Sequence, residues 1–202
     1  MKSYALIFIP VLVIGALLIS ISGTSEVDEY ILPDSGIEQI EPEEAFDKMM
    51  DVLTHQRCMN CHPNDNVPKQ GEDRHPHYFD MARGRADKGF QATKCATCHQ
   101  EENNDYSGAP GAPHWSLAPE SMGWQGLSRT EIARIVLDPE TNGGKSNEEL
   151  VKHMTEDELV LWAWKPGVGT DGKPRELPPV TEEEFKMAVE IWFEKGAVIP
   201  SK

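Results

Sequence analysis

The sequence predicts an all-α protein with long loops, preceded by an apolar N-terminal segment. Four Ser/Thr-x-x-Glu pairs typical of helix capping boxes occur in the second half of the chain, each next to apolar residues at helical spacing. No stretch shows the alternation of apolar and polar residues that marks a strand or a hairpin. With 202 residues, the chain is long enough for one domain with a sizeable core.

Residues 1–25 are interpreted as a signal peptide or a membrane anchor. Residues 4–22 are apolar or small, Lys2 is the only charge before them, and the first acid is Glu26. This arrangement is typical of an export segment. The uncharged stretch is longer than a usual signal core, which favours an anchor in the inner membrane over cleavage. In either case we expect the rest of the chain to lie in the bacterial periplasm or an equivalent compartment.

Residues 26–40 are expected to form an acidic tether. Nine acids and no base occur between Glu26 and Asp47, and the whole chain has a net charge of −15. Such a charge repels nucleic acid and favours partner proteins with a basic docking face. The alternative is that the acids only confer solubility.

Residues 41–202 are expected to form the folded domain, which opens with an amphipathic helix over Glu41 to His55. Pro42 suits the first turn of that helix. Its apolar face consists of Phe46, Met49, Met50 and Leu53.

Two Cys-x-x-Cys-His motifs, at residues 58–62 and 95–99, are the most informative feature of the chain. In this motif the thiols form thioether bonds to the vinyl groups of a haem, and the histidine ligates the iron. The two motifs use all four cysteines of the chain. The sequence therefore predicts two haem c groups, attached through Cys58, Cys61, Cys95 and Cys98, with His62 and His99 as proximal ligands.

The same cysteines could instead form a four-cysteine zinc site. The segment between the two pairs is longer than the roughly 15–20 residues usual for such a site, and zinc does not explain a histidine after both pairs. The export segment also favours haem, because covalent attachment takes place outside the cytoplasm. Cys58 and Cys95 lie 37 positions apart, too close for two independent cytochrome domains, so both haems are expected in one compact fold.

The distal position of each iron distinguishes a carrier from an enzyme. Arg74-His75-Pro76-His77 is the best source for one iron, with His77 favoured and His75 next. For the other iron the candidates are His114 and Met122.

Two further histidines remain. His153 is predicted to be a hydrogen-bonded core histidine. His55 stands too close to the first motif to turn back onto its own haem, but it could reach the other haem. Arg83 and Arg85 are candidates to neutralise propionates. The tryptophans, which line the porphyrins or fill the core, are residues 115, 124, 162, 164 and 192.

The last third of the chain is expected to be regular. Its capping boxes are Ser128 with Glu131, Ser146 with Glu149, Thr155 with Glu158, and Thr181 with Glu184. Helices should end before Asp138-Pro139, at Pro166 and at Gly196. Segments 63–89 and 103–126 are expected to be loops that wrap the haems.

Several segments resemble a bacterial family of small dihaem c-type cytochromes that is often labelled a subunit of isoquinoline 1-oxidoreductase. The resemblance covers about residues 45–197. It is carried by residues 58–63, 70–77, 83–84, 110–115, 138–139, 142–144, 161–164 and 166–167. It implies an electron acceptor for a molybdenum hydroxylase.

The predicted function is electron transfer without catalysis, as a carrier or as the electron-transfer subunit of an oxidoreductase. Both irons would be six-coordinate, taking electrons from a periplasmic or membrane dehydrogenase and passing them to a downstream acceptor. The alternative is a haem enzyme or gas sensor with one open iron. A third possibility is a structural haem unit in a larger conducting assembly.

Overall fold

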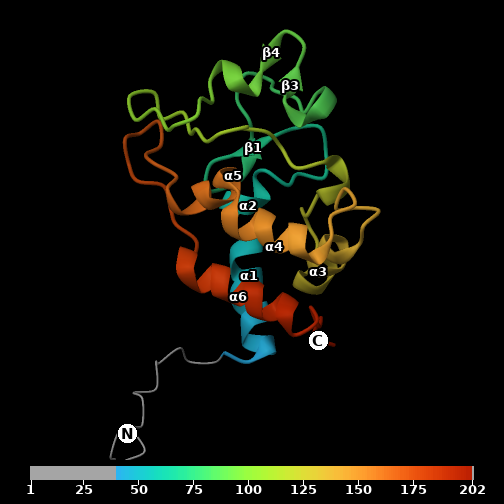
Figure 1. The fold of residues 1–202 in the computed structure, drawn as a ribbon. Coiled ribbons are helices and arrows are strands. Elements are labelled where there is room, and N and C mark those ends of the chain that lie inside the picture. Colours follow the sequence, from blue (N-terminus) through green and yellow to red (C-terminus); the bar gives the residue numbers. More distant parts are fainter. Residues whose placement is uncertain (1–39, 202) are drawn as a thin grey trace, which may run out of the picture. The chain divides into compact units, whose positions relative to one another are not determined.

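The computed structural model describes residues 40–201, in which helices form one end and loops with small sheets form the other (Figure 1). The described residues group into one unit. The expected signal peptide or anchor and residues 26–39 of the expected tether lie outside the described residues. Among the helices of residues 40–201, none is long and apolar enough to cross a membrane.

The helical end is organised around the first and last helices. α1 (Pro42–Leu53) packs against α6 (Glu182–Glu194). Pro42 at the start of α1 and glutamates in the first turn of both helices favour these N-termini. The helix expected over Glu41 to His55 is therefore confirmed, with slightly shorter ends.

Three of the four expected capping boxes are confirmed. Ser128, Ser146 and Thr181 cap α3 (Arg129–Leu137), α4 (Asn147–Glu156) and α6, and in each case the glutamate side chain bonds back to the cap. α3 ends before Asp138-Pro139 as expected, and Gly196 follows α6 with a φ of 89°.

The fourth expected box, Thr155 with Glu158, is wrong. Thr155 lies in the last turn of α4, where its hydroxyl donates to the Val151 carbonyl at 2.8 Å. α5 (Glu158–Leu161) is instead capped by Asp157, whose carboxylate accepts from the Leu159 amide at 2.9 Å. α5 continues into η4 (Trp162–Trp164), which ends before Pro166.

The all-α expectation is also wrong, because the loops contain two small antiparallel sheets. β1 (Lys69–Gln70) pairs with β2 (His75–Pro76), and β3 (Gly89–Phe90) pairs with β4 (Thr93–Lys94). Each strand has two residues, which is too short for the alternation that reveals a strand in a sequence. The remaining elements are short helical turns: α2 (Gln56–Met59), η1 (Arg85–Asp87), η2 (Cys95–Thr97) and η3 (Glu120–Met122).

The hydrophobic core lies among α1, α3, α4 and α6. Its largest fully buried side chains include Trp192, Phe185, Met49, Met50 and Ile132. Trp192 donates its indole N–H to the Val198 carbonyl at 2.8 Å, so its polar atom is satisfied. The loop-rich end is therefore attached to a well-packed helical core.

We expect Phe185→Ala to lower the free energy of unfolding by about 3–5 kcal/mol, because it removes a fully buried aromatic ring between α6 and the core. Denaturant titration would measure this. The control, Glu190→Ala, changes an exposed position of the same helix and should stay within about 0.5 kcal/mol. Equal losses in both variants would contradict this account of the core.

Candidate haem-binding sites

The first motif forms a tight turn at the end of α2. The Cys61 amide donates to the Cys58 carbonyl at 3.0 Å, and the His62 amide donates to the Met59 carbonyl at 3.3 Å. The turn places both thiols and the imidazole within one short stretch of backbone, as attachment to a single porphyrin requires. Arg57 in the same helix is buried and ion-paired with Glu72.

The imidazole of His62 is held in one orientation. Its Nδ1 donates to the Met122 carbonyl at 2.8 Å, and its ring stacks on Trp124 with centroids 3.5 Å apart and planes 14° apart. Because a carbonyl only accepts, the proton lies on Nδ1 and the lone pair lies on Nε2. This is the tautomer that a metal ligand needs.

The second motif repeats this construction. It begins with η2, and the His99 amide donates to the Cys95 carbonyl at 2.9 Å. His99 Nδ1 donates to the Pro110 carbonyl at 2.8 Å, and the ring stacks on Trp115 with centroids 4.6 Å apart and planes 7° apart. Both proximal candidates therefore present Nε2 as a free donor atom.

A glycine follows each carbonyl that accepts from a proximal histidine. A Cβ on Gly111 would lie 2.1 Å from the Glu102 carbonyl oxygen, and a Cβ on Gly123 would lie 2.7 Å from Asn64 Cα. The loops that supply the carbonyls thus approach the residues after each motif so closely that only glycine fits. Sequence reasoning missed Pro110-Gly111 as site residues, and it expected the Met122 thioether as a ligand where the structure uses the Met122 carbonyl and the glycine after it.

Burial favours the uncharged forms of the imidazole and the two thiols of the first site. Burial lowers the pKa of His62 to about 4 and raises the pKa of Cys58 to about 12. Burial also raises the pKa of Cys61 to about 11, and the neighbouring Cys95 adds to this rise. At neutral pH the site therefore holds an uncharged imidazole and two protonated thiols. In the second site, burial likewise lowers the pKa of His99.

This donor set fits haem c. All four cysteines are free, so no disulfide competes with thioether formation. In the part of the chain that the structure describes, no group of three or more His, Cys, Asp or Glu side chains is arranged to hold a metal ion.

His77 lies beside His99. Their ring centroids are 5.9 Å apart with planes at 75°, and His77 Nδ1 donates to the Tyr78 carbonyl at 2.7 Å. If two imidazoles bound one metal from opposite sides through metal–nitrogen bonds of about 2 Å, their ring centroids would lie about 6 Å apart. The separation of His77 and His99 suits ligation of one iron from both sides.

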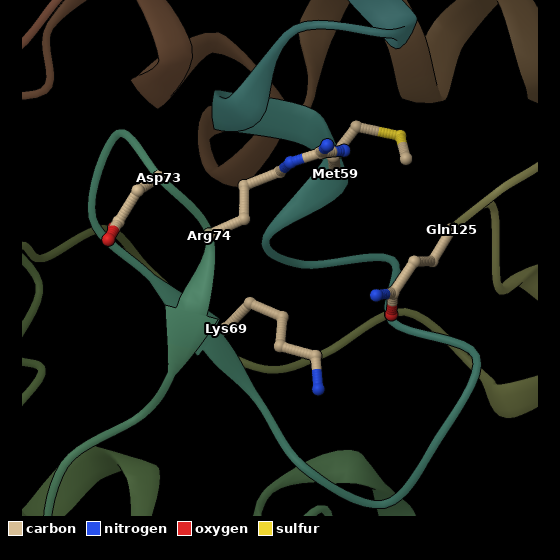
Figure 2. A pocket seen from close by; sticks show the side chains of 5 residues that line it. All are labelled: Met59, Lys69, Asp73, Arg74 and Gln125. Carbon is tan, nitrogen blue, oxygen red and sulfur yellow. The ribbon is translucent and has the colours of Figure 1, made fainter.

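His75 points elsewhere. Its Nδ1 lies 2.6 Å from Asp73 Oδ1, its ring contacts Tyr78, and its Nε2 is buried without a hydrogen-bond partner among residues 40–201. The turn between β1 and β2, which precedes His75, lines a small polar pocket beside the first motif (Figure 2). That pocket is lined by Met59, Lys69, Asp73, Arg74 and Gln125, and by neither proximal histidine.

The two candidates for the other iron are placed differently from each other. His114 is exposed, with a φ of 60°, and makes no hydrogen bond or ring contact within residues 40–201. Met122 contributes its carbonyl to His62, while its buried side chain belongs to the hydrophobic core. Neither position favours a ligand that faces His62 or His99.

The buried side chain of Arg83 joins separate segments of the chain through hydrogen bonds. It is 4% exposed, donates to the Pro63 carbonyl and to Asp87 Oδ1 at 2.8 Å each, and also donates to the Ala118 carbonyl. Its donors therefore connect the loop after the first motif with the segment before η3. This arrangement does not support the expected role in neutralising a propionate.

Comparison with known proteins identifies no relative, since no family model, no curated protein and no solved structure matches the chain. The site is therefore interpreted from its own residues.

We expect Gly111→Ala to destabilise the protein by about 1–3 kcal/mol, because the new methyl group meets the Glu102 backbone and displaces the Pro110 carbonyl from His99. Unfolding titrations would measure the loss. In the control Gly169→Ala, the nearest atom is the movable Asp171 carboxylate at 3.1 Å, so the loss should be smaller. Equal losses would show that the close approach at Gly111 is not required.

Acidification from pH 7 to pH 4 should lower the stability of the protein. Below the ordinary pKa of 6.5 the unfolded chain protonates His62, whereas the folded imidazole gains a proton only near pH 4. The unfolded state thus binds more protons in this window, and stability falls as the pH falls. Denaturation midpoints at a series of pH values would test this, and a midpoint that rises on acidification would contradict it.

Proposed function

We propose that the protein is an electron carrier with two covalently attached c-type haems. The observation that carries this proposal is the matched construction of the two motifs. In each, the histidine donates Nδ1 to a backbone carbonyl at 2.8 Å and stacks on a tryptophan, which leaves Nε2 for iron. When bound, haem supplies one-electron chemistry that no side chain of the chain provides.

The closeness of the two motifs supports transfer within the protein. The Cys95 thiolate raises the pKa of Cys61, and one segment, residues 110–124, supplies the acceptor carbonyl to the histidine of each motif. His62 and His99 belong to these same motifs, so the two proximal ligands lie in neighbouring parts of one fold. We expect electrons to pass between two haems held in this way.

The proposal also includes the cellular compartment of the protein and its redox partner. We place the domain in the periplasm, tethered by residues 26–40, with residues 4–22 as the anchor in the inner membrane if they are not cleaved. Its net charge of −15 suits a redox partner with a basic docking face. The family resemblance suggests a molybdenum hydroxylase as the donor.

The test is expression of the exported part with a cytochrome maturation system, followed by measurement of covalent haem per chain. We expect two haems in the wild type and one in each of two variants, Cys58→Ser/Cys61→Ser and Cys95→Ser/Cys98→Ser. Each variant is the matched control for the other, because it removes one pair of thiols and leaves the other site complete.

Reduced spectra with and without carbon monoxide then separate a carrier from the alternative functions. A carrier has two six-coordinate irons that do not take up carbon monoxide. An iron that binds it readily would favour the haem enzyme or gas sensor. A purified chain with zinc and no haem would refute the proposed function.

A further inference from the structure

His77 is held in position by the hairpin of β1 and β2. Its amide donates to the Pro68 carbonyl at 2.8 Å, which extends the pairing of the two strands by one residue. The next amide, that of Tyr78, donates to Gln70 Oε1 at 3.1 Å, and the Tyr78 carbonyl accepts from His77 Nδ1 at 2.7 Å. Hydrogen bonds within this segment therefore orient both the backbone and the ring of His77.

The hairpin is attached to the first motif but places His77 at the second. Asn60, which lies inside the first motif, donates its side-chain amide to the Gly71 carbonyl in the hairpin turn at 3.0 Å. The ring of His77 lies beside that of His99 in the second motif, with centroids 5.9 Å apart. The segment that follows the first motif thus contributes a residue to the second site.

His77 and His99 both present a lone pair rather than a donor and an acceptor. Nδ1 of each ring donates to a backbone carbonyl, so Nε2 carries the lone pair in both neutral imidazoles. Neither Nε2 has a hydrogen-bond partner within residues 40–201. Because neither ring offers the other a proton, no hydrogen bond can join the two Nε2 atoms. An electron-pair acceptor such as iron would engage both.

An edge-to-face ring contact is the alternative explanation of this pair. Such contacts have centroid separations of about 4.5–7 Å, a range that includes the 5.9 Å found here. A ring contact alone, however, does not account for two imidazoles that both have Nδ1 bonded to a carbonyl and Nε2 left as an acceptor. Ligation of one iron accounts for both the separation and the two tautomers.

No other histidine combines these features. Nδ1 of His55 accepts from the Arg57 amide at 3.3 Å, so its proton lies on Nε2 and no lone pair is left for a metal. Within the described part of the chain, a ring contact with His62 or His99 is absent for His55, His75, His114 and His153.

We infer that His77 is the distal ligand of the iron that His99 holds, so that the hairpin after the first motif completes the second haem site. This inference rests on the proposed function, since it assumes haem at the second motif. The two irons would then differ, because no histidine ring among the described residues contacts His62 as His77 contacts His99. A haem held by two histidines should have a lower reduction potential than one held by histidine and methionine.

The experiment introduces His77→Ala into two full-length, single-haem backgrounds. Cys58→Ser/Cys61→Ser keeps only the haem of the second motif, and Cys95→Ser/Cys98→Ser keeps only that of the first. In the former, His77→Ala should convert nearly all of the haem to a high-spin form that binds carbon monoxide, and added imidazole should restore the low-spin form. In the latter, the same substitution should leave the absorption and electron paramagnetic resonance spectra unchanged.

His75→Ala is the matched control, because it removes the other histidine of the hairpin, whose Nδ1 is also engaged, and should leave both haems unchanged. His77→Met guards against misfolding of the alanine variant, since a thioether can still ligate iron. It should keep the second haem low-spin and raise its reduction potential.

The inference is overturned if the second haem stays low-spin and excludes carbon monoxide in His77→Ala, or if His77→Met leaves its potential unchanged. A change confined to the first haem would also overturn it. Wild type without covalent haem would instead overturn the proposed function.

Discussion

The structure depends on one requirement, that each motif histidine donates Nδ1 to a carbonyl from another part of the chain. Both carbonyls come from the same segment, residues 110–124, which supplies Pro110, Gly111 and Trp115 to one motif and then Met122, Gly123 and Trp124 to the other. This one segment, called the strap below, thus orients both imidazoles. The two sites are not independent, because a shift of this strap displaces the acceptors of both.

The strap is in turn fixed to the helical end. Asn103 accepts from the Gly111 amide at 3.0 Å and from the Trp162 indole at 2.9 Å, and it donates to the Lys165 carbonyl at 2.7 Å. Trp164, in the same short helix η4, contacts Phe185 in α6. Trp162 contacts Trp115, which stacks on His99, so contacts run without interruption from the buried core to the ring of His99.

Helices with a periodic apolar face or a capping box could be predicted from the sequence. Two-residue strands, and contacts between residues far apart in the chain, could not. The helix at residues 42–53 and three capping boxes could be recognised because their signals lie within a few residues of one another. The sheets of two-residue strands have no periodicity to detect. The expected hydrogen bond of His153 is present, but its expected core position is wrong, because the side chain is 41% exposed and its burial depends on how α4 packs, which no local pattern contains.

The high pKa values of the Cys58 and Cys61 thiols have a consequence for biogenesis. Only a small fraction of either thiol ionises at neutral pH once the domain has folded, and both cysteines are half-buried. In the extended chain the same thiols are exposed and ordinary. Under the proposed function, haem attachment would therefore be favoured on the unfolded polypeptide, before the domain folds.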